Sequence, residues 1–243
     1  MSQARQPDAS APDPAGDRTT TGPAGADGTG GGWAEAAEAR VLDQAIRLAP
    51  TLHWNAGLAK AAARAAGLSE ADATLLLPKG AADLAALLVR RHDAAALEAL
   101  AALDLATLKI RERIYRGVTA RMEAAMADEP AVRRAAAFLA TPSHAPLALT
   151  LGWATADALW RWAGDTATDE NHYSKRAILG AVLGSTMAVR LSAGPDRADA
   201  HLKARIEQVM AFETWKAGAP SPVGLASAAA GLLGRLRYGS RLS

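Results

Sequence analysis

Apolar residues recur every three to four positions along most of the chain after residue 32, which is the spacing of amphipathic helices. Val41, Leu42 and Ile46 form the first such stripe, and Pro50 follows it as a stop signal. Further helical stretches are expected at 54–66, 69–77, 83–92, 97–126, 131–140, 146–163, 168–193 and 196–215. No segment alternates as a strand does, and no internal repeat occurs. The pattern predicts an all-α protein of about nine or ten helices.

The two ends of the chain differ from this helical part, which we place at 33–218. Residues 1–32 hold mostly Gly, Pro, Ala, Asp, Ser and Thr without apolar periodicity, so we expect them to be disordered. They have no apolar stretch typical of a signal peptide. They are also a poor match to a transit peptide, because the acids outnumber the arginines Arg5 and Arg18.

Residues 219–243 form a linker followed by a predicted amphipathic helix that lies on a membrane surface. No acid occurs after Glu213, which together with an apolar face is typical of an interfacial helix. The alternative is a short helix that packs back on the domain. The predicted membrane-binding residues are Leu225, Leu232, Leu233, Leu236, Arg235 and Arg237.

The composition is typical of a helical protein and agrees with a reducing compartment, although it does not prove one. Half of the residues are hydrophobic, chiefly Ala and Leu, and this bias favours helices over sheet. The chain has no cysteine, which excludes disulfides, thiolate metal sites and cysteine nucleophiles. The formal net charge of +2 is too small to indicate a nucleic-acid-binding protein.

One polar segment, 160–176, interrupts the apolar pattern. Asp165, Asp169 and Glu170 could form a carboxylate cluster for a metal, but acids are common at helix starts for local reasons. No Glu-x-x-His or His-x-x-x-His spacing and no Gly-rich phosphate loop occurs. We therefore expect no catalytic residues, no metal and no cofactor, so the protein is predicted not to be an enzyme.

Arg176 stands out in this segment because it lies about two turns inside a predicted helix. The helix dipole therefore does not explain its presence. Its guanidinium either pairs with a nearby carboxylate or binds an anion such as a phosphate. The sequence favours the salt bridge but leaves both interpretations open.

Residues 41–92 have the helix order of a TetR-type helix-turn-helix module. The short helix that would enter the major groove begins Ser69-Glu70-Ala71-Asp72 and carries no Arg, Lys, Asn or Gln. Its acids would repel phosphates, and the side chains that read bases are missing. We expect a vestigial module without specific DNA binding.

The segment around 157–186 resembles the signature of the Coq-nine family, the lipid-binding accessory proteins of ubiquinone biosynthesis. Leu77-Pro78-Lys79-Gly80 also resembles a family motif, and the likeness covers about residues 40–215. The residues that match the signature are Asp157, Trp160, Ala163, Gly164, Asp165, Thr168, Asp169, Asn171, Tyr173, Lys175, Arg176 and the pair Ser185-Thr186. His172 departs from it, because the family has Trp there.

The resemblance implies a TetR-like fold that binds isoprenoid quinone intermediates or phospholipids and presents them to the di-iron demethoxyubiquinone hydroxylase. It implies that Arg176 contacts a lipid head group. It assigns Asp169, His172 and Tyr173, with Asp157 and Trp160, to the partner surface. Positions 169, 172, 173 and 176 are linked by steps of three and four, so we expect them to share one helix face.

These observations predict a protein of the bacterial cytoplasm, peripheral at the inner membrane, with the hydroxylase and membrane lipids as partners. A homodimer is left open. The alternative function is a TetR-type transcriptional regulator with a hydrophobic ligand pocket.

Overall fold

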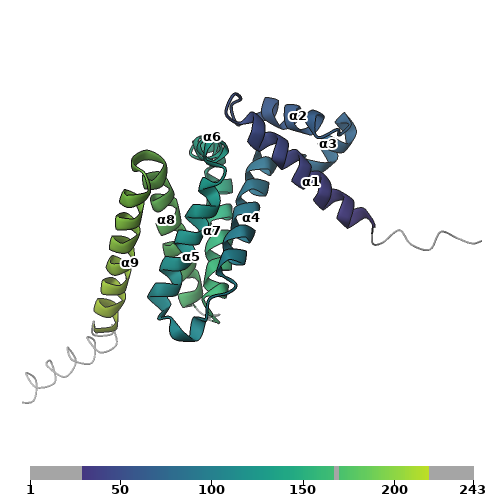
Figure 1. Ribbon diagram of the computed structural model, residues 1–243. Helices are drawn as coiled ribbons and strands as arrows, with labels where there is room; N and C mark the ends of the chain where they lie inside the picture. The colour runs from purple at the N-terminus through teal and green to yellow at the C-terminus, as the bar shows by residue number, and fades with distance from the viewer. Residues whose placement is uncertain (1–28, 167–169, 219–243) are drawn as a thin grey trace, which may run out of the picture.

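The chain folds into helices throughout its described part, as the apolar pattern predicts. The computed structural model describes residues 29–166 and 170–218, and within these ranges it contains nine α-helices, two short 3-10 helices and no strand. Figure 1 shows α1–α3 gathered at one end of the molecule and the hairpin of α8 and α9 at the other. The prediction of an all-α protein with about nine helices is confirmed. The helix order is consistent with the TetR-like arrangement expected from the resemblance.

The helices follow one another with short connections. Their bounds are α1 Thr29–Leu48, α2 Ala56–Ala65, α3 Glu70–Leu76, α4 Ala81–Leu100, α5 Ile110–Met126, α6 Glu129–Leu139, α7 Ala145–Trp162, α8 Glu170–Ala193 and α9 Pro195–Gly218. The 3-10 helices are Leu105–Thr107 and Pro142–His144.

The starts of the two helices after α1 are set by local caps. The Asn55 side chain accepts a hydrogen bond from the Leu58 N–H, and the Ser69 hydroxyl accepts one from the Asp72 N–H, so each satisfies a donor in the first turn. The indole of Trp54 donates to the Ala81 carbonyl at 2.9 Å and ties the start of α2 to α4. Helix α3 has no buried residue, so it is held at the surface.

The long apolar stretch expected at 97–126 is divided into two helices. Helix α4 ends at Leu100 and α5 begins at Ile110. Between them the Asp104 carboxylate accepts a hydrogen bond from the Ala106 N–H and begins the 3-10 turn. Asp is a frequent residue at such a start because its side chain competes for backbone donors.

Two apolar cores share the interior. One joins α1, α2, α4 and α6, and its fully buried members include Val41, Leu58 and Leu84. The other joins α5, α7, α8 and α9 around Val118 and Leu202. Helix α4 contacts α1, α2, α5, α6 and α7, so it connects the two cores (Figure 1).

Several predictions concern segments outside the described residues. These are the disorder of residues 1–32, as far as 28, and the membrane-surface helix at 219–243 with its leucines and arginines; residues 29–32, also expected to be disordered, belong to α1. Helix α1 begins at Thr29, slightly before the expected start of the helical domain at 33. Among the helices that the structure describes, none combines the length and the apolar character needed to cross a bilayer.

Candidate functional site

The polar segment of the sequence becomes a network of five charged side chains between the end of α7 and the start of α8. Asp157 forms an ion pair with Nε of Arg161 at 2.8 Å and accepts a hydrogen bond from Nε of Arg176 at 2.6 Å. Asp165 pairs with Nη1 of Arg176 at 3.1 Å and with Nζ of Lys175 at 2.7 Å. Three cations meet two carboxylates, so we call these five residues the charged corner and count a formal charge of +1 on it.

Arg176 lies at the centre of the charged corner and is buried. Only 2% of the residue is exposed, and Nη1 also donates to the His172 carbonyl at 3.2 Å. The salt bridge favoured by the sequence is therefore present. A direct contact between Arg176 and a lipid head group stays a prediction, and the guanidinium already binds two carboxylates.

Asp165 is held ionised by its neighbours. Burial alone would raise the pKa of Asp165, but hydrogen bonds from Lys175 and Arg176, together with their charges, lower it below the ordinary value. An ionised Asp165 in turn keeps Lys175 and Arg176 in place. The carboxylate of Asp165 is thus engaged in ion pairs. Asp169, which was considered with it as part of a metal-binding cluster, lies outside the described residues.

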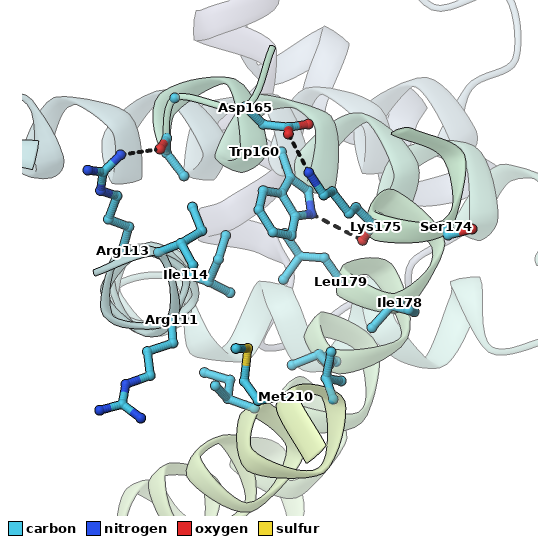
Figure 2. Close-up of a pocket in the computed structure, with 16 residues that line it drawn as sticks. Arg111, Arg113, Ile114, Trp160, Asp165, Ser174, Lys175, Ile178, Leu179 and Met210 are labelled. Carbon is cyan, nitrogen blue, oxygen red and sulfur yellow. Dashed lines mark hydrogen bonds and ion pairs between the residues drawn. The ribbon is translucent and has the colours of Figure 1, made fainter. Parts of the chain in front are cut away.

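Two members of the charged corner, Asp165 and Lys175, line a cavity. Nζ of Lys175 lies 5.3 Å from the centre of the Trp160 ring, and 29% of the Lys175 side chain is exposed. The Trp160 indole N–H donates to the backbone carbonyl of Lys175 at 3.1 Å (Figure 2). Trp160 therefore contacts both the backbone and the side chain of Lys175. A lysine has three N–H donors, and Asp165 takes one of them.

The cavity beside Lys175, which we call the first cavity, has a volume of about 350 Å³ and lies between α5, α7, α8 and α9. Volumes of roughly 300–1,000 Å³ are typical of small-molecule sites. Figure 2 shows Trp160, Ile114 and Leu179 around its interior. Its apolar walls are completed by Ile110, Ala163, Ile178, Val182, Ile206, Val209 and Met210. Arg111, Arg113 and Lys175 bring positive charge to its lining, and Asp165 brings one carboxylate, which is paired with Lys175.

Arg113 also lines the first cavity, and the sequence interpretation missed it. Its guanidinium donates to three backbone carbonyls, those of Leu105, Leu108 and Ala163, at 2.6, 3.0 and 2.7 Å. These bonds join the 3-10 turn to the end of α7, so Arg113 acts as a structural clamp. No local spacing signals this contact, because Ala163 is 50 positions away.

The residues assigned to the partner surface, as far as the structure describes them, lie in different surroundings. Asp157 belongs to the charged corner, and Trp160 is a half-buried wall of the first cavity. Tyr173 is 64% exposed, whereas Arg176, three positions further along the same helix, is buried, so the two residues differ in exposure. The reason is that α8 packs on α7 through the side that carries Arg176. Partner binding by these residues stays a prediction.

Tyr173 instead joins an exposed aromatic surface contributed by α7. Its ring centre lies 6.0 Å from that of Trp153 and 5.2 Å from that of His172. Leu149, one turn before Trp153, is 76% exposed. We call Leu149, Trp153 and Tyr173 the exposed patch. The sequence signal was available, because the helix at 146–163 is apolar on several sides and cannot bury all of them.

The chain is similar to curated proteins of one kind. It is 28% identical over 180 residues to the ubiquinone biosynthesis protein COQ9, mitochondrial, of Bos taurus, covering 70% of this chain and 56% of that protein. The proteins of the same name from Xenopus tropicalis and Homo sapiens are 27% and 26% identical, over 74% and 66% of this chain and 60% and 52% of theirs. The chain thus spans between half and two thirds of the length of these relatives.

The relatives correct the predicted location. All of them carry the word mitochondrial in their names, which contradicts the expectation of a bacterial cytoplasm with attachment to the inner membrane. That expectation depended on the charge pattern of residues 1–32. A targeting address is read by a receptor rather than required by the fold, so the helical domain carries no trace of it.

A family model gives the same relationship over a defined stretch. The COQ9 model matches residues 145–213, which begin at the first residue of α7 and run through α8 into α9. This stretch contains the whole exposed patch and the whole charged corner. The family model and the curated relatives together make this chain similar to COQ9 proteins, most specifically over α7, α8 and most of α9.

Proposed function

We propose that this protein is a lipid-binding accessory protein of ubiquinone biosynthesis that holds its lipid in the first cavity and presents it to the demethoxyubiquinone hydroxylase. The curated relatives support the role in ubiquinone biosynthesis. The proposals that the chain binds a lipid and presents it to the hydroxylase rest on the geometry of α7 and α8. The role requires no catalytic residue of this chain.

The observation that carries the proposal is an apolar cavity with a cation at its edge. The walls offer aliphatic, aromatic and thioether groups, which suit a hydrocarbon chain. Lys175 offers N–H donors and a charge beside these walls. An amphipathic molecule with an apolar tail and an anionic head matches both features.

The buried ion pairs assign different tasks to the two neighbouring cations. Lys175 is partly exposed and lines the cavity, so it is the residue we propose for direct contact with a head group. Arg176 lies behind it and pairs with Asp165, which also binds Lys175. Arg176 thereby acts on the head group by positioning Lys175 through Asp165.

The exposed patch is the surface we propose for the hydroxylase. Large apolar side chains that remain in water near one another commonly mark an interaction site, and Trp and Tyr are frequent binding hot spots. Tyr173 is on the same helix as Lys175, so a partner seated there would lie near the cavity. His172, which contacts Tyr173 edge-on, offers less apolar area than the family Trp.

Native mass spectrometry of the purified full chain, with extraction and identification of the bound lipid, tests this function. We expect co-purified phospholipid or prenyl quinone, and a severalfold loss of anionic phospholipid in Lys175→Ala. The matched control is Lys203→Ala, because Lys203 also pairs with an aspartate and lies 5.5 Å from a tyrosine ring but does not line the first cavity. Ile178→Trp should fill the cavity and exclude lipid of every class.

The proposal fails if the wild-type chain carries no lipid, or if Lys175→Ala, Ile178→Trp and Lys203→Ala retain equal amounts. Binding of the hydroxylase is measured separately by biolayer interferometry. Tyr173→Ala and Trp153→Ala should weaken it at least tenfold, whereas His172→Trp should strengthen it. Unchanged affinity in all three variants would remove the exposed patch from the proposal.

A further inference from the structure

The first cavity reaches the surface at one end of the molecule, where α5 begins and α9 ends. Figure 1 shows the connection between α4 and α5 at the same end as the last turns of α9. Ile110, the first residue of α5, and Met210, in the second half of α9, both line the cavity. Although both are large apolar residues, they are 43% and 41% exposed. This opening therefore leaves apolar groups in water.

Basic side chains flank the exposed isoleucine. Lys109 and Arg111 stand on either side of Ile110 in the chain, and both are exposed. Within the described residues, neither side chain takes part in an ion pair or a hydrogen bond. Figure 2 shows the Arg111 side chain directed away from Trp160. We call Lys109, Ile110, Arg111 and Met210 the mouth of the first cavity.

The turn that carries most of the mouth has a positive charge. Residues 103–116 include four basic and two acidic residues, a formal charge of +2. Both acids are engaged locally, because Glu112 pairs with Arg116 at 3.0 Å and Asp104 accepts a hydrogen bond from the Ala106 N–H at 3.0 Å. Lys109 and Arg111 are therefore left to meet a charge from outside the domain.

A second cavity offers a contrast. Its volume is about 330 Å³, and it lies between α4, α5, α6, α7 and α8. Leu149 is exposed there, but Arg121, the one arginine or lysine in its described lining, is buried and paired with Asp93. Exposed apolar groups and exposed, unpaired cations thus occur together at the first cavity and not at the second.

Exposed apolar side chains among cations are typical of a protein surface that meets an anionic bilayer. The apolar groups enter the boundary between head groups and acyl chains, and the cations are attracted by the lipid phosphates. The course of the chain favours a bilayer over an acidic protein. Met210 lies about two turns before Gly218, where α9 ends. Residues 219–243, outside the described part, follow with leucines, arginines and no acid.

We propose that the mouth of the first cavity is a contact between the helical domain and an anionic bilayer, additional to the contribution of residues 219–243. Ile110 and Met210 enter the head-group boundary, and Lys109 and Arg111 bind lipid phosphates. The contact turns the first cavity toward the bilayer, which gives the lipid of the proposed function a route of entry. The contact itself does not require a lipid in the cavity.

The test is sedimentation of the full chain with vesicles of phosphatidylglycerol and phosphatidylcholine in equal amounts. The double variant Lys109→Gln/Arg111→Gln should bind them more weakly by roughly tenfold or more, because two cations at the surface are lost. The matched control is Lys60→Gln/Arg64→Gln, which removes the same charge from exposed positions of α2, at the other end of the molecule (Figure 1). We expect this control to bind like the wild type.

The apolar part of the contact is tested in the same assay. Ile110→Asn should weaken vesicle binding severalfold, because a polar side chain opposes entry into the acyl boundary. Leu75→Asn is its control, since Leu75 on α3 is 77% exposed but lies far from the mouth. Circular dichroism checks that each variant is folded.

A spin label reports the contact without removing any of its apolar groups. The chain has no cysteine, so Arg111→Cys and Lys60→Cys can each carry one label. We expect anionic vesicles to shield the label in Arg111→Cys from a water-soluble nickel relaxation agent, and to leave the label in Lys60→Cys accessible.

The contact is overturned if both double variants bind vesicles equally, or if the label in Arg111→Cys stays accessible on bound vesicles. Binding that is as tight to vesicles of phosphatidylcholine alone would also overturn it. Native mass spectrometry keeps this inference apart from the proposed function. A chain that docks through the mouth but carries no lipid would support the contact and contradict the proposed function.

Discussion

Arg161 and Arg176 bind the same carboxylate, that of Asp157, from very different environments. The Arg161 side chain is 72% exposed and that of Arg176 is 2% exposed. Exposed ion pairs contribute less than about 1 kcal/mol, whereas removing one partner of a buried pair costs about 3–5 kcal/mol. We therefore expect Arg176→Ala to be strongly destabilising in urea unfolding, and Arg161→Ala to unfold almost like the wild type.

The same pair of variants separates a structural role from direct lipid contact. Arg176→Lys should recover part of the lost stability, because the charge remains but the guanidinium that reaches both Asp157 and Asp165 does not. A folded Arg176→Ala with wild-type stability and depleted lipid would contradict the buried ion pair and favour direct head-group binding.

His92 makes stability depend on pH near neutrality. Burial lowers its pKa below the ordinary value of 6.5, and the hydrogen bond to Asp128 opposes this only in part. As the pH falls, the unfolded state therefore takes up a proton before the folded state does. The contribution of His92 to the free energy of unfolding is fully present above pH 6.5 and is lost as the pH drops below that value.

Urea unfolding at pH 7.5 and 5.5 measures this effect in a window above the ordinary pKa values of carboxylates. We expect the wild type to lose stability between these pH values and His92→Asn to lose less. His53→Asn, at an exposed histidine, should behave like the wild type. Equal losses in the wild type and His92→Asn would show that His92 is not the group responsible.

At the scale of elements, the end of α7 depends on Gly164. Its φ is +89°, its N–H donates to the Arg161 carbonyl, and the next N–H, of Asp165, donates to the Trp160 carbonyl, both at 3.0 Å. This is the hydrogen-bond arrangement of a left-handed helix end, which turns Asp165 back toward α8. An alanine Cβ there would also lie 3.3 Å from Nη1 of Arg113.

Two glycines of the same helix should therefore respond in opposite directions. Gly164→Ala should lower the free energy of unfolding by about 1–2 kcal/mol, because an L side chain is strained at this φ. Gly152→Ala lies inside α7 with open space at its Cβ and should raise it by up to about 1 kcal/mol. Differential scanning calorimetry measures the stability of both variants. A Gly164→Ala variant as stable as the wild type would contradict the left-handed helix end at Gly164.

At the scale of the whole molecule, helix order and surface chemistry point to different functions. Helices α1–α4 follow the order expected of a DNA-binding module, but α3 carries Glu70 and Asp72 in its first turn and no basic residue. We expect no sequence-specific DNA binding in gel-shift titrations on the upstream region of its own gene. Sub-micromolar binding that distinguishes this DNA from a scrambled duplex would favour the regulator instead.

The sequence by itself determined where most of the helices lie, although not the break between α4 and α5. Apolar spacing, Asn55 and Ser69 as caps, and the glycine at the end of α7 are local features, and each acts within one or two turns. The acidic character of α3 and the presence of a charged corner near 157–176 could also be predicted, because these residues are close in the chain.

Only the tertiary structure decided which side of each helix is buried and which side chains meet. Periodicity grouped Tyr173 with Arg176, but packing on α7 buries one and leaves the other in water. The contacts of Asp93 with Arg121 and Thr155 join positions 28 and 62 residues apart, and no local rule reaches that far. Both cavities form where four or five helices meet, so they exist only after these helices have packed.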